Sequence, residues 1–172
     1  MAVAQPALQK KICMLGGFSV GKTSLVKRFV SSVFSEAYLT TVGVKIDKKT
    51  VDLDDRAVNL ILWDVAGEDD VSTVKMSYLR GSAGYVLVAD GTRLSTLEVA
   101  LSLRGRVEAE LGPLPFVLLL NKSDLKDEWA IDDAKMEELR QTGWSVRASS
   151  AKSGEGVEDA FRELAVRVTA KQ

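Results

Sequence analysis

The sequence predicts an α/β fold in which a mostly parallel sheet lies between two layers of helices. Short apolar segments that suit buried strands alternate along the chain with segments whose apolar residues have helical spacing. Several of the strands are apolar on both faces, which is typical of a parallel sheet covered by helices. The 172 residues, 46% of them hydrophobic, suffice for one domain with a buried core, and no linker or repeat divides them. We expect a tail over residues 1–9 and a single domain over residues 10–170.

The first half of the chain begins with an expected strand over residues 11–15, followed by a glycine-rich loop and a helix. One face of that helix is apolar, through Leu25, Val26, Phe29, Val30 and Val33. Residues 31–43 are polar and without strong periodicity, so we expect a long loop, and such loops in compact domains are usually functional. Residues 44–53 and 57–63 are β-rich and joined by a short acidic turn, which predicts an antiparallel hairpin.

The second half continues the alternation after a break at residues 64–67 and a polar stretch up to residue 81. We expect strands over residues 85–89, 116–120 and 144–148. A helix face that begins near Leu97 ends at Leu111, before Gly112 and Pro113, and a short helix near residues 131–142 ends at Gly143. The last helix, over residues 157–169, has the cleanest periodicity in the sequence.

The composition excludes several classes of function. The net charge is -1, with 23 basic and 24 acidic residues, so nucleic acid and anionic membranes are not expected partners. Histidine, the commonest general base, is absent, and Cys13 in the first strand is expected to be a buried structural thiol. No apolar run approaches the roughly 18 residues that span a bilayer, and residues 1–9 lack the layout of a signal peptide. We expect a cytoplasmic monomer.

Residues 16–23 match the phosphate-loop pattern G-x-x-x-x-G-K-S/T at every fixed position, between an expected strand and an expected helix. Gly16 and Gly21 allow backbone angles that turn N–H groups inward, and the helix N-terminus adds partial positive charge. Lys22 can reach terminal phosphates, and the Thr23 hydroxyl can ligate Mg²⁺. An ordinary glycine-containing turn is the alternative, but both flanks favour phosphate binding.

Three further polar clusters follow strands: residues 64–67, 121–124 and 150–152. Because the carboxyl ends of parallel strands share one edge of a sheet, we expect these clusters and the phosphate loop to form one site. Asp64 can hold Mg²⁺ through water, and the Gly67 N–H can meet a terminal phosphate. Thr41, in the long loop, can complete the metal shell from the other side. Taken alone, each cluster is also consistent with an ordinary turn.

The cluster Asn121-Lys122-Ser123-Asp124 indicates which nucleotide base the site binds. The Asp124 carboxylate can accept from the N1–H and the exocyclic amine of guanine, a donor pair that adenine lacks on that edge. The aliphatic stem of Lys122 can cover the face of the base. Phe34 is a candidate aromatic contact beside the base, whereas Trp63, inside an expected strand, is better explained as core or partner surface.

The segments GGFSVGKTS, TTVGV, WDVAGE, NKSD and SSAKS together resemble a Ras-superfamily small GTPase, closest in pattern to the Rab branch. The resemblance implies a P-loop NTPase fold with a six-stranded sheet, one strand antiparallel, and a switch that binds GTP or GDP with Mg²⁺. It also implies contacts from Ala151 and Lys152 to the guanine. Effectors and regulators would bind switch I, Phe34 to Gly43, and switch II, Gly67 to Arg80.

The candidate residues fall into three sets. The metal ligands are Thr23, Thr41 and Asp64, and the residues expected to act in hydrolysis are Lys22, Thr41, Gly67 and Glu68. The nucleotide-binding set is Gly16, Phe18, Ser19, Val20, Gly21, Lys22, Thr23, Ser24, Phe34, Thr41, Gly67, Asn121, Lys122, Asp124, Ser150, Ala151 and Lys152.

Three departures from the family pattern bear on activity. Glu68 stands where members usually have the glutamine that orients the attacking water, and Phe18 stands where small residues are usual. The sequence ends at Lys171-Gln172 without a cysteine, so we expect no lipid anchor, either because a longer protein is truncated or because a prokaryotic Rab-like protein is never lipidated. Slow hydrolysis is expected. The alternatives are a pseudo-GTPase that binds nucleotide with negligible hydrolysis and, less in keeping with residues 121–124, a P-loop kinase.

Overall fold

The computed structural model describes residues 7–31, 44–65 and 76–170 of the chain. Their strands form one six-stranded sheet in the order β2-β3-β1-β4-β5-β6. β2 and β3 pair antiparallel, and the other neighbours pair parallel, which confirms the predicted fold class. The strands are β1 (Leu8–Gly16), β2 (Val44–Asp52), β3 (Ala57–Val65), β4 (Gly84–Asp90), β5 (Phe116–Asn121) and β6 (Ser145–Ala148).

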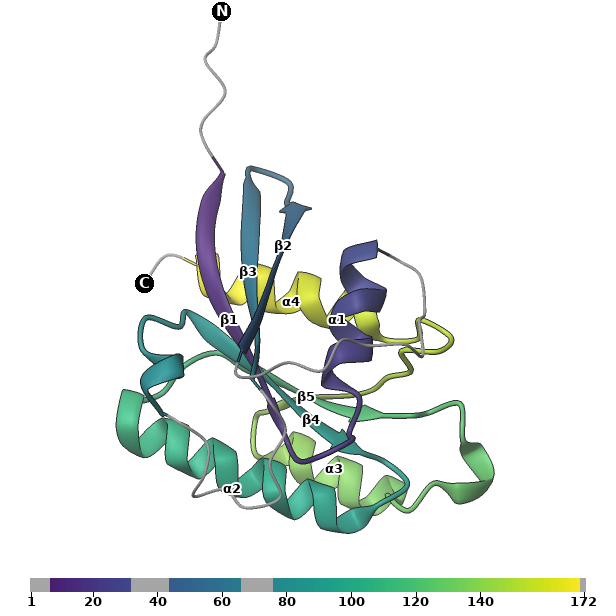
Figure 1. The fold of residues 1–172 in the computed structure, drawn as a ribbon. Helices are drawn as coiled ribbons and strands as arrows, with labels where there is room; N and C mark the ends of the chain where they lie inside the picture. The colour runs from purple at the N-terminus through teal and green to yellow at the C-terminus, as the bar shows by residue number, and fades with distance from the viewer. Residues whose placement is uncertain (1–6, 32–43, 66–75, 171–172) are drawn as a thin grey trace, which may run out of the picture.

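Helices cover both faces of the sheet (Figure 1). α1 (Lys22–Ser31) and α4 (Val157–Thr169) lie on one face, and α2 (Leu94–Leu111) and α3 (Asp133–Gln141) lie on the other. Two short 3₁₀ helices, η2 (Met76–Leu79) and η3 (Lys126–Glu128), lie in the connections. The helices described here include none long and apolar enough to cross a membrane.

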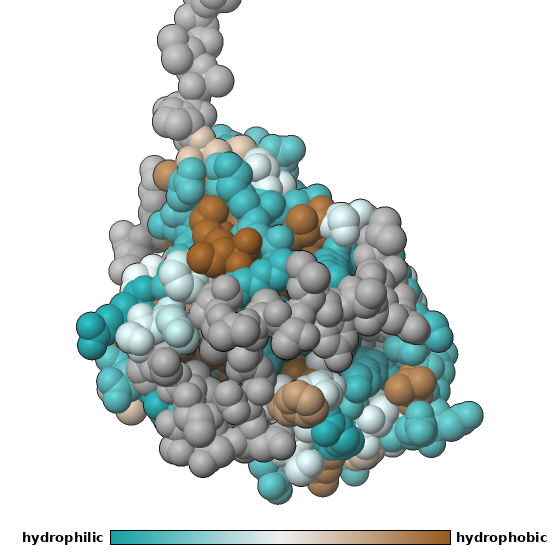
Figure 2. Space-filling view, in the orientation of Figure 1, coloured by the Kyte–Doolittle hydropathy of each residue, from teal (hydrophilic) through white to brown (hydrophobic). Residues whose placement is uncertain are grey.

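Strands with apolar side chains on both faces explain why the sheet needs a layer of helices on each side. Along β1, Ile12 and Met14 join the core beneath α1 and α4, whereas Cys13 and Leu15 join the core beneath α2 and α3. All four side chains are at most 1% exposed, and the expected buried thiol of Cys13 is confirmed. The coloured part of the molecular surface in Figure 2 is mostly hydrophilic, and its apolar areas are small and separate.

Aromatic packing fixes the helix that follows the phosphate loop. The ring of Phe29 in α1 stacks on that of Phe161 in α4, with centroids 4.2 Å apart and ring planes 7° apart. Both rings are at most 1% exposed. Because α1 begins at Lys22, directly after the loop, this contact also fixes where the loop ends.

Three of the element boundaries that differ from the sequence prediction have a clear physical reason. β1 begins at Leu8 rather than at residue 11, because its backbone continues to pair with β3 beyond the apolar segment. β3 extends to Val65, so the break expected at residue 64 is wrong, and Asp64 lies within the strand opposite Lys45. α3 begins at Asp133, where the Asp132 carboxylate caps the helix by accepting from the Lys135 N–H.

Candidate nucleotide site

The loops that follow β1, β4, β5 and β6 lie together at one edge of the sheet (Figure 1). Asn121, at the end of β5, donates from its side-chain amide to the Val20 carbonyl in the loop after β1, at 2.9 Å. Arg28 in α1 donates to the Ala151 carbonyl in the loop after β6, at 2.8 Å. Segments more than 100 residues apart in the chain are therefore neighbours. The structure therefore brings together the sequence clusters at residues 16–23, 121–124 and 150–152.

Side chains hold the carbonyls of the phosphate loop in place. Lys22 donates from Nζ to the carbonyl of Gly16 at 3.1 Å and to that of Gly17 at 3.4 Å. In a trans peptide the N–H and C=O groups point in opposite directions, so fixing a carbonyl also fixes the direction of the N–H in the same peptide. A run of such N–H groups at a helix N-terminus favours an anion.

The second half of the loop is held by the segment after β5. Lys122 donates from Nζ to the Ser19 carbonyl at 3.1 Å, beside the contact from Asn121 to Val20. Ser19 and Lys122 both have left-handed backbones, with φ of 59° and 71°. Non-glycine residues rarely adopt that conformation unless surrounding contacts enforce it, and it is typical of ligand-binding loops.

Gly21 cannot be replaced without distorting this arrangement. Its φ is 102°, and a Cβ atom there would lie 2.3 Å from the Asn121 side-chain nitrogen. The close approach lets Asn121 reach the loop backbone. The glycine that the sequence pattern requires therefore serves both the local backbone angle and the contact with β5.

Two of the expected metal ligands, Thr23 and Asp64, lie where α1 meets β3. The Thr23 hydroxyl donates to Asp64 Oδ2 at 2.5 Å, and Asp64 is only 3% exposed. Burial raises the pKa of Asp64, and the Thr23 bond and the positive charges of Lys22 and Lys45 offset part of that rise. Two hard oxygen donors side by side, one of them a buried carboxylate, suit Mg²⁺.

Of the described residues, those expected to contact the base lie after β5 and β6. The Ser150 hydroxyl donates to Asp124 Oδ1 at 2.8 Å and accepts from the Ser153 N–H at 3.0 Å. Ser150 is fully buried, whereas Asp124 is exposed. The buried serine therefore holds one oxygen of an accessible carboxylate in place, as recognition of a polar base edge requires.

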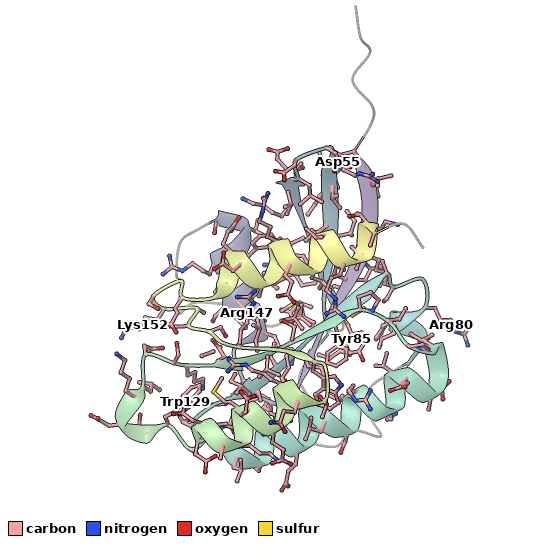
Figure 3. All side chains as sticks on the ribbon, turned by 180° about the vertical axis from the view of Figure 1, so that it is seen from behind. Asp55, Arg80, Tyr85, Trp129, Arg147 and Lys152 are labelled. Atoms are coloured by element: carbon pink, nitrogen blue, oxygen red, sulfur yellow. The ribbon has the colours of Figure 1, made fainter. Side chains whose placement is uncertain are left out.

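The two remaining residues expected near the base, Ala151 and Lys152, lie in the loop after β6 and differ in exposure. Ala151 is 6% exposed, and Lys152 is exposed on the same loop (Figure 3). Arg28 donates to the carbonyls of both residues, and these bonds hold the loop against α1. Figure 3 shows Trp129 at the same end of the molecule as Lys152, with Tyr85 farther along toward Arg80.

A fifth polar group, at the end of β4, was missed by the sequence analysis. Asp90 is 1% exposed and accepts from the Thr92 N–H and hydroxyl, from Arg93 Nε at 3.0 Å and from Lys122 Nζ at 2.9 Å. Burial alone would raise the pKa of Asp90, but the bonds from Thr92, Lys122 and Arg93 outweigh it and lower the pKa. The sequence pattern could have identified it, because the polar segment Asp90-Gly91-Thr92 comes at the end of an apolar strand, as the other clusters do.

Several candidates lie outside the part of the chain that the structure describes: Phe34, Thr41, Gly67 and Glu68, with all of expected switch I and residues 67–75 of expected switch II. Of the others, Ser24 lies half-buried in the first turn of α1, and Phe18 is 60% exposed on the phosphate loop. Trp63 is half-buried on β3, with Lys11 Nζ 3.7 Å from its ring centroid.

Comparisons with known proteins identify the family of the chain. The Ras family model matches residues 11–170. Mouse Ras-related protein Rab-32 is 32% identical over 94% of this chain and 76% of its own length. Ras-related protein Rab-10 of Caenorhabditis elegans is 32% identical, over 94% of this chain and 81% of its own. Bovine Ras-related protein Rab-7b is 33% identical, over 94% and 82%. With the fold and the phosphate loop described above, these matches show that the chain is a Rab-like member of the Ras family of small GTPases.

Proposed function

We propose that this protein is a guanine-nucleotide switch that binds Mg·GTP and GDP at this site and hydrolyses GTP slowly. The observation that carries the proposal is the 2.9 Å bond from Asn121 to the Val20 carbonyl. It supports the proposal because it holds the expected base-selecting segment beside the phosphate loop, where one ligand can reach both ends. A ligand that fills both ends has a base and a chain of phosphates, and the Asp124 carboxylate favours guanine over adenine.

Mg²⁺ fits the pair Thr23 and Asp64, with the threonine hydroxyl as a direct ligand and the carboxylate acting through water. Bound there, the metal would neutralise charge on the phosphate oxygens. Lys22 adds a further positive charge, and the loop N–H groups orient the phosphates for displacement in line. Thr41 is proposed to join the metal shell only in the triphosphate state, ordering switch I for a partner protein.

Slow hydrolysis is proposed from Glu68 and Phe18. An ionised carboxylate accepts but cannot donate, so Glu68 cannot both hold the attacking water and donate to the phosphoryl group as glutamine does. At about 4 Å and an effective dielectric near 20, a carboxylate and a phosphate charge repel by roughly 4 kcal/mol before Mg²⁺ and Lys22 offset part of it. The Phe18 side chain, 60% exposed, stands where an arginine from an activating protein would enter.

The test is to identify the nucleotide that the purified protein retains and then to follow single-turnover GTP hydrolysis. We expect bound guanine nucleotide, phosphate release no faster than roughly 10⁻⁴ s⁻¹, and a faster rate for Glu68→Gln. A Glu68→Gln variant slower than the wild type would make Glu68 itself catalytic. Retention of GTP with no phosphate release would identify a pseudo-GTPase, and phosphate transfer to a small acceptor would identify a kinase.

A further inference from the structure

Each carbonyl of residues 16–20 accepts a hydrogen bond from a side chain. Lys22, Lys122 and Asn121 account for those of Gly16, Gly17, Ser19 and Val20, and all three donors belong to the sequence motifs. The remaining carbonyl, that of Phe18, accepts from Arg93 Nη2 at 2.9 Å. Arg93 belongs to none of the motifs and comes from a different element, the residue before α2.

Arg93 bridges two acceptors on different segments. Its Nε donates to Asp90 Oδ2 at 3.0 Å while its Nη2 donates to the Phe18 carbonyl. The planar guanidinium presents these donors in a fixed fork, which a lysine ammonium cannot reproduce. Asp90 is 2% exposed at its side chain and is also paired with Lys122, so the bridge is anchored to buried structure. This anchoring distinguishes it from an ordinary ion pair between exposed groups, which contributes little.

The position of Arg93 in the helix argues against a role in starting α2. It is the N-cap residue, where Ser, Thr, Asp or Asn is preferred because a short side chain accepts from the first turn. Arg93 makes no such capping bond. Its side chain instead extends back to the phosphate loop, across 75 residues of sequence.

The peptide that Arg93 holds lies at the most constrained point of the loop. The Phe18 carbonyl and the Ser19 N–H belong to one planar trans peptide, so the bond from Arg93 to the carbonyl also fixes the N–H, which points the opposite way. Ser19 has a φ of 59°, which disfavours this arrangement for a residue with a side chain. Arg93 and Lys122 hold the peptides on either side of Ser19.

We propose that Arg93 is a positioning residue for the nucleotide phosphates. By tying the Phe18 carbonyl to Asp90, it keeps the Ser19 N–H directed at the bound phosphate chain and slows nucleotide release. The inference rests on the proposed function, because it assigns a determinant of how long that site keeps its nucleotide.

The experiment measures GDP dissociation from the full chain with a fluorescent GDP analogue chased by excess GDP. We expect Arg93→Ala to release GDP about 10-fold faster, equivalent to about 1.4 kcal/mol. Arg93→Lys keeps the positive charge and the aliphatic stem but not the forked guanidinium. We therefore expect its GDP dissociation rate to lie between those of the wild type and Arg93→Ala. Arg162→Ala is the matched control: Arg162 also donates to a backbone carbonyl, that of Asp52 at 2.8 Å, but far from the loop. Its rate should equal that of the wild type.

A second measurement separates positioning from general stability. In ¹⁵N–¹H spectra of the GDP-bound protein, Arg93→Ala should shift or broaden the Ser19 amide signal and leave that of Gly21, whose preceding carbonyl is held by Asn121, unchanged. Dissociation of GDP from Arg93→Ala within twofold of the wild type, or an unchanged Ser19 signal, would overturn the assignment of Arg93. Failure of the wild type to bind GDP would overturn the proposed function and this inference with it.

Discussion

Asp124→Asn tests the base end of the proposed site most directly. The Ser150 hydroxyl donates to Asp124 Oδ1, so an asparagine there would keep its oxygen toward Ser150 and turn its NH₂ group to the position of Oδ2. That NH₂ would face the exocyclic amine of guanine, donor against donor. A hydrogen bond to a charged group contributes about 1.5–3 kcal/mol, and an unmatched buried donor costs about as much again. The two contributions add to at least about 3 kcal/mol, so we expect GDP affinity to fall by at least roughly 100-fold.

Xanthine has a carbonyl where guanine has the amine, so the same variant should bind xanthosine diphosphate more tightly than the wild type does. Equilibrium titration with both diphosphates measures the switch in preference. Ser150→Ala is the control, because it frees the Asp124 carboxylate without changing its hydrogen-bonding capacity, and it should weaken both ligands without exchanging their order. Asp124→Asn with GDP affinity within a factor of two of the wild type would refute the assignment of Asp124 to the base.

Three further predictions concern the metal, the pH dependence and the core. Thr23→Ala should weaken Mg²⁺ binding to the GDP complex at least 10-fold, as measured by Mg²⁺ titration of GDP retention; an unchanged titration would remove Thr23 from the metal shell. Burial raises the pKa of Tyr85 to about 12, so its neutral form stabilises the fold below pH 10, and this contribution is lost as pH rises toward 12. The loss should reach about 1.4 kcal/mol at pH 11 in urea unfolding and be absent from Tyr85→Phe; parallel pH curves for the two proteins would contradict it. Phe29→Ala should lower the free energy of unfolding by about 3–5 kcal/mol, because it leaves a cavity against Phe161, whereas Val166→Ala on the exposed face of α4 should change it by less than about 0.5 kcal/mol.

The sequence predicts elements well where one physical signal dominates. α4 matches the predicted residues 157–169, because its buried face has strict helical spacing and its other face is polar. The ends of β1 and β3 were misjudged because backbone pairing with a neighbouring strand continues through Lys10 and Asp64 whatever their side chains. Strand ends depend on partners that a local pattern does not contain.

The residues of the candidate site likewise fall into those that local spacing predicts and those that depend on tertiary packing. Lys22, Thr23 and Asp124 could be predicted because fixed spacing on a loop is itself the signal. The bridge from Arg93 to Phe18 could not, because it depends on how the start of α2 is placed against the loop after β1. Such contacts are decided by the packing of helices and sheet rather than by any local run of residues.

The stacking of Phe29 on Phe161 has a consequence for how the protein is made. Synthesis proceeds from the N-terminus, so the phosphate loop and α1 leave the ribosome well before α4 does. Until Phe161 arrives, one face of the Phe29 ring lacks its native partner, and the helix that begins at Lys22 lacks the packing that fixes it. The phosphate loop, although encoded early, is therefore completed late. A nascent chain released before α4 should expose this aromatic surface and hold phosphate poorly, which makes α4 the element whose docking completes the site.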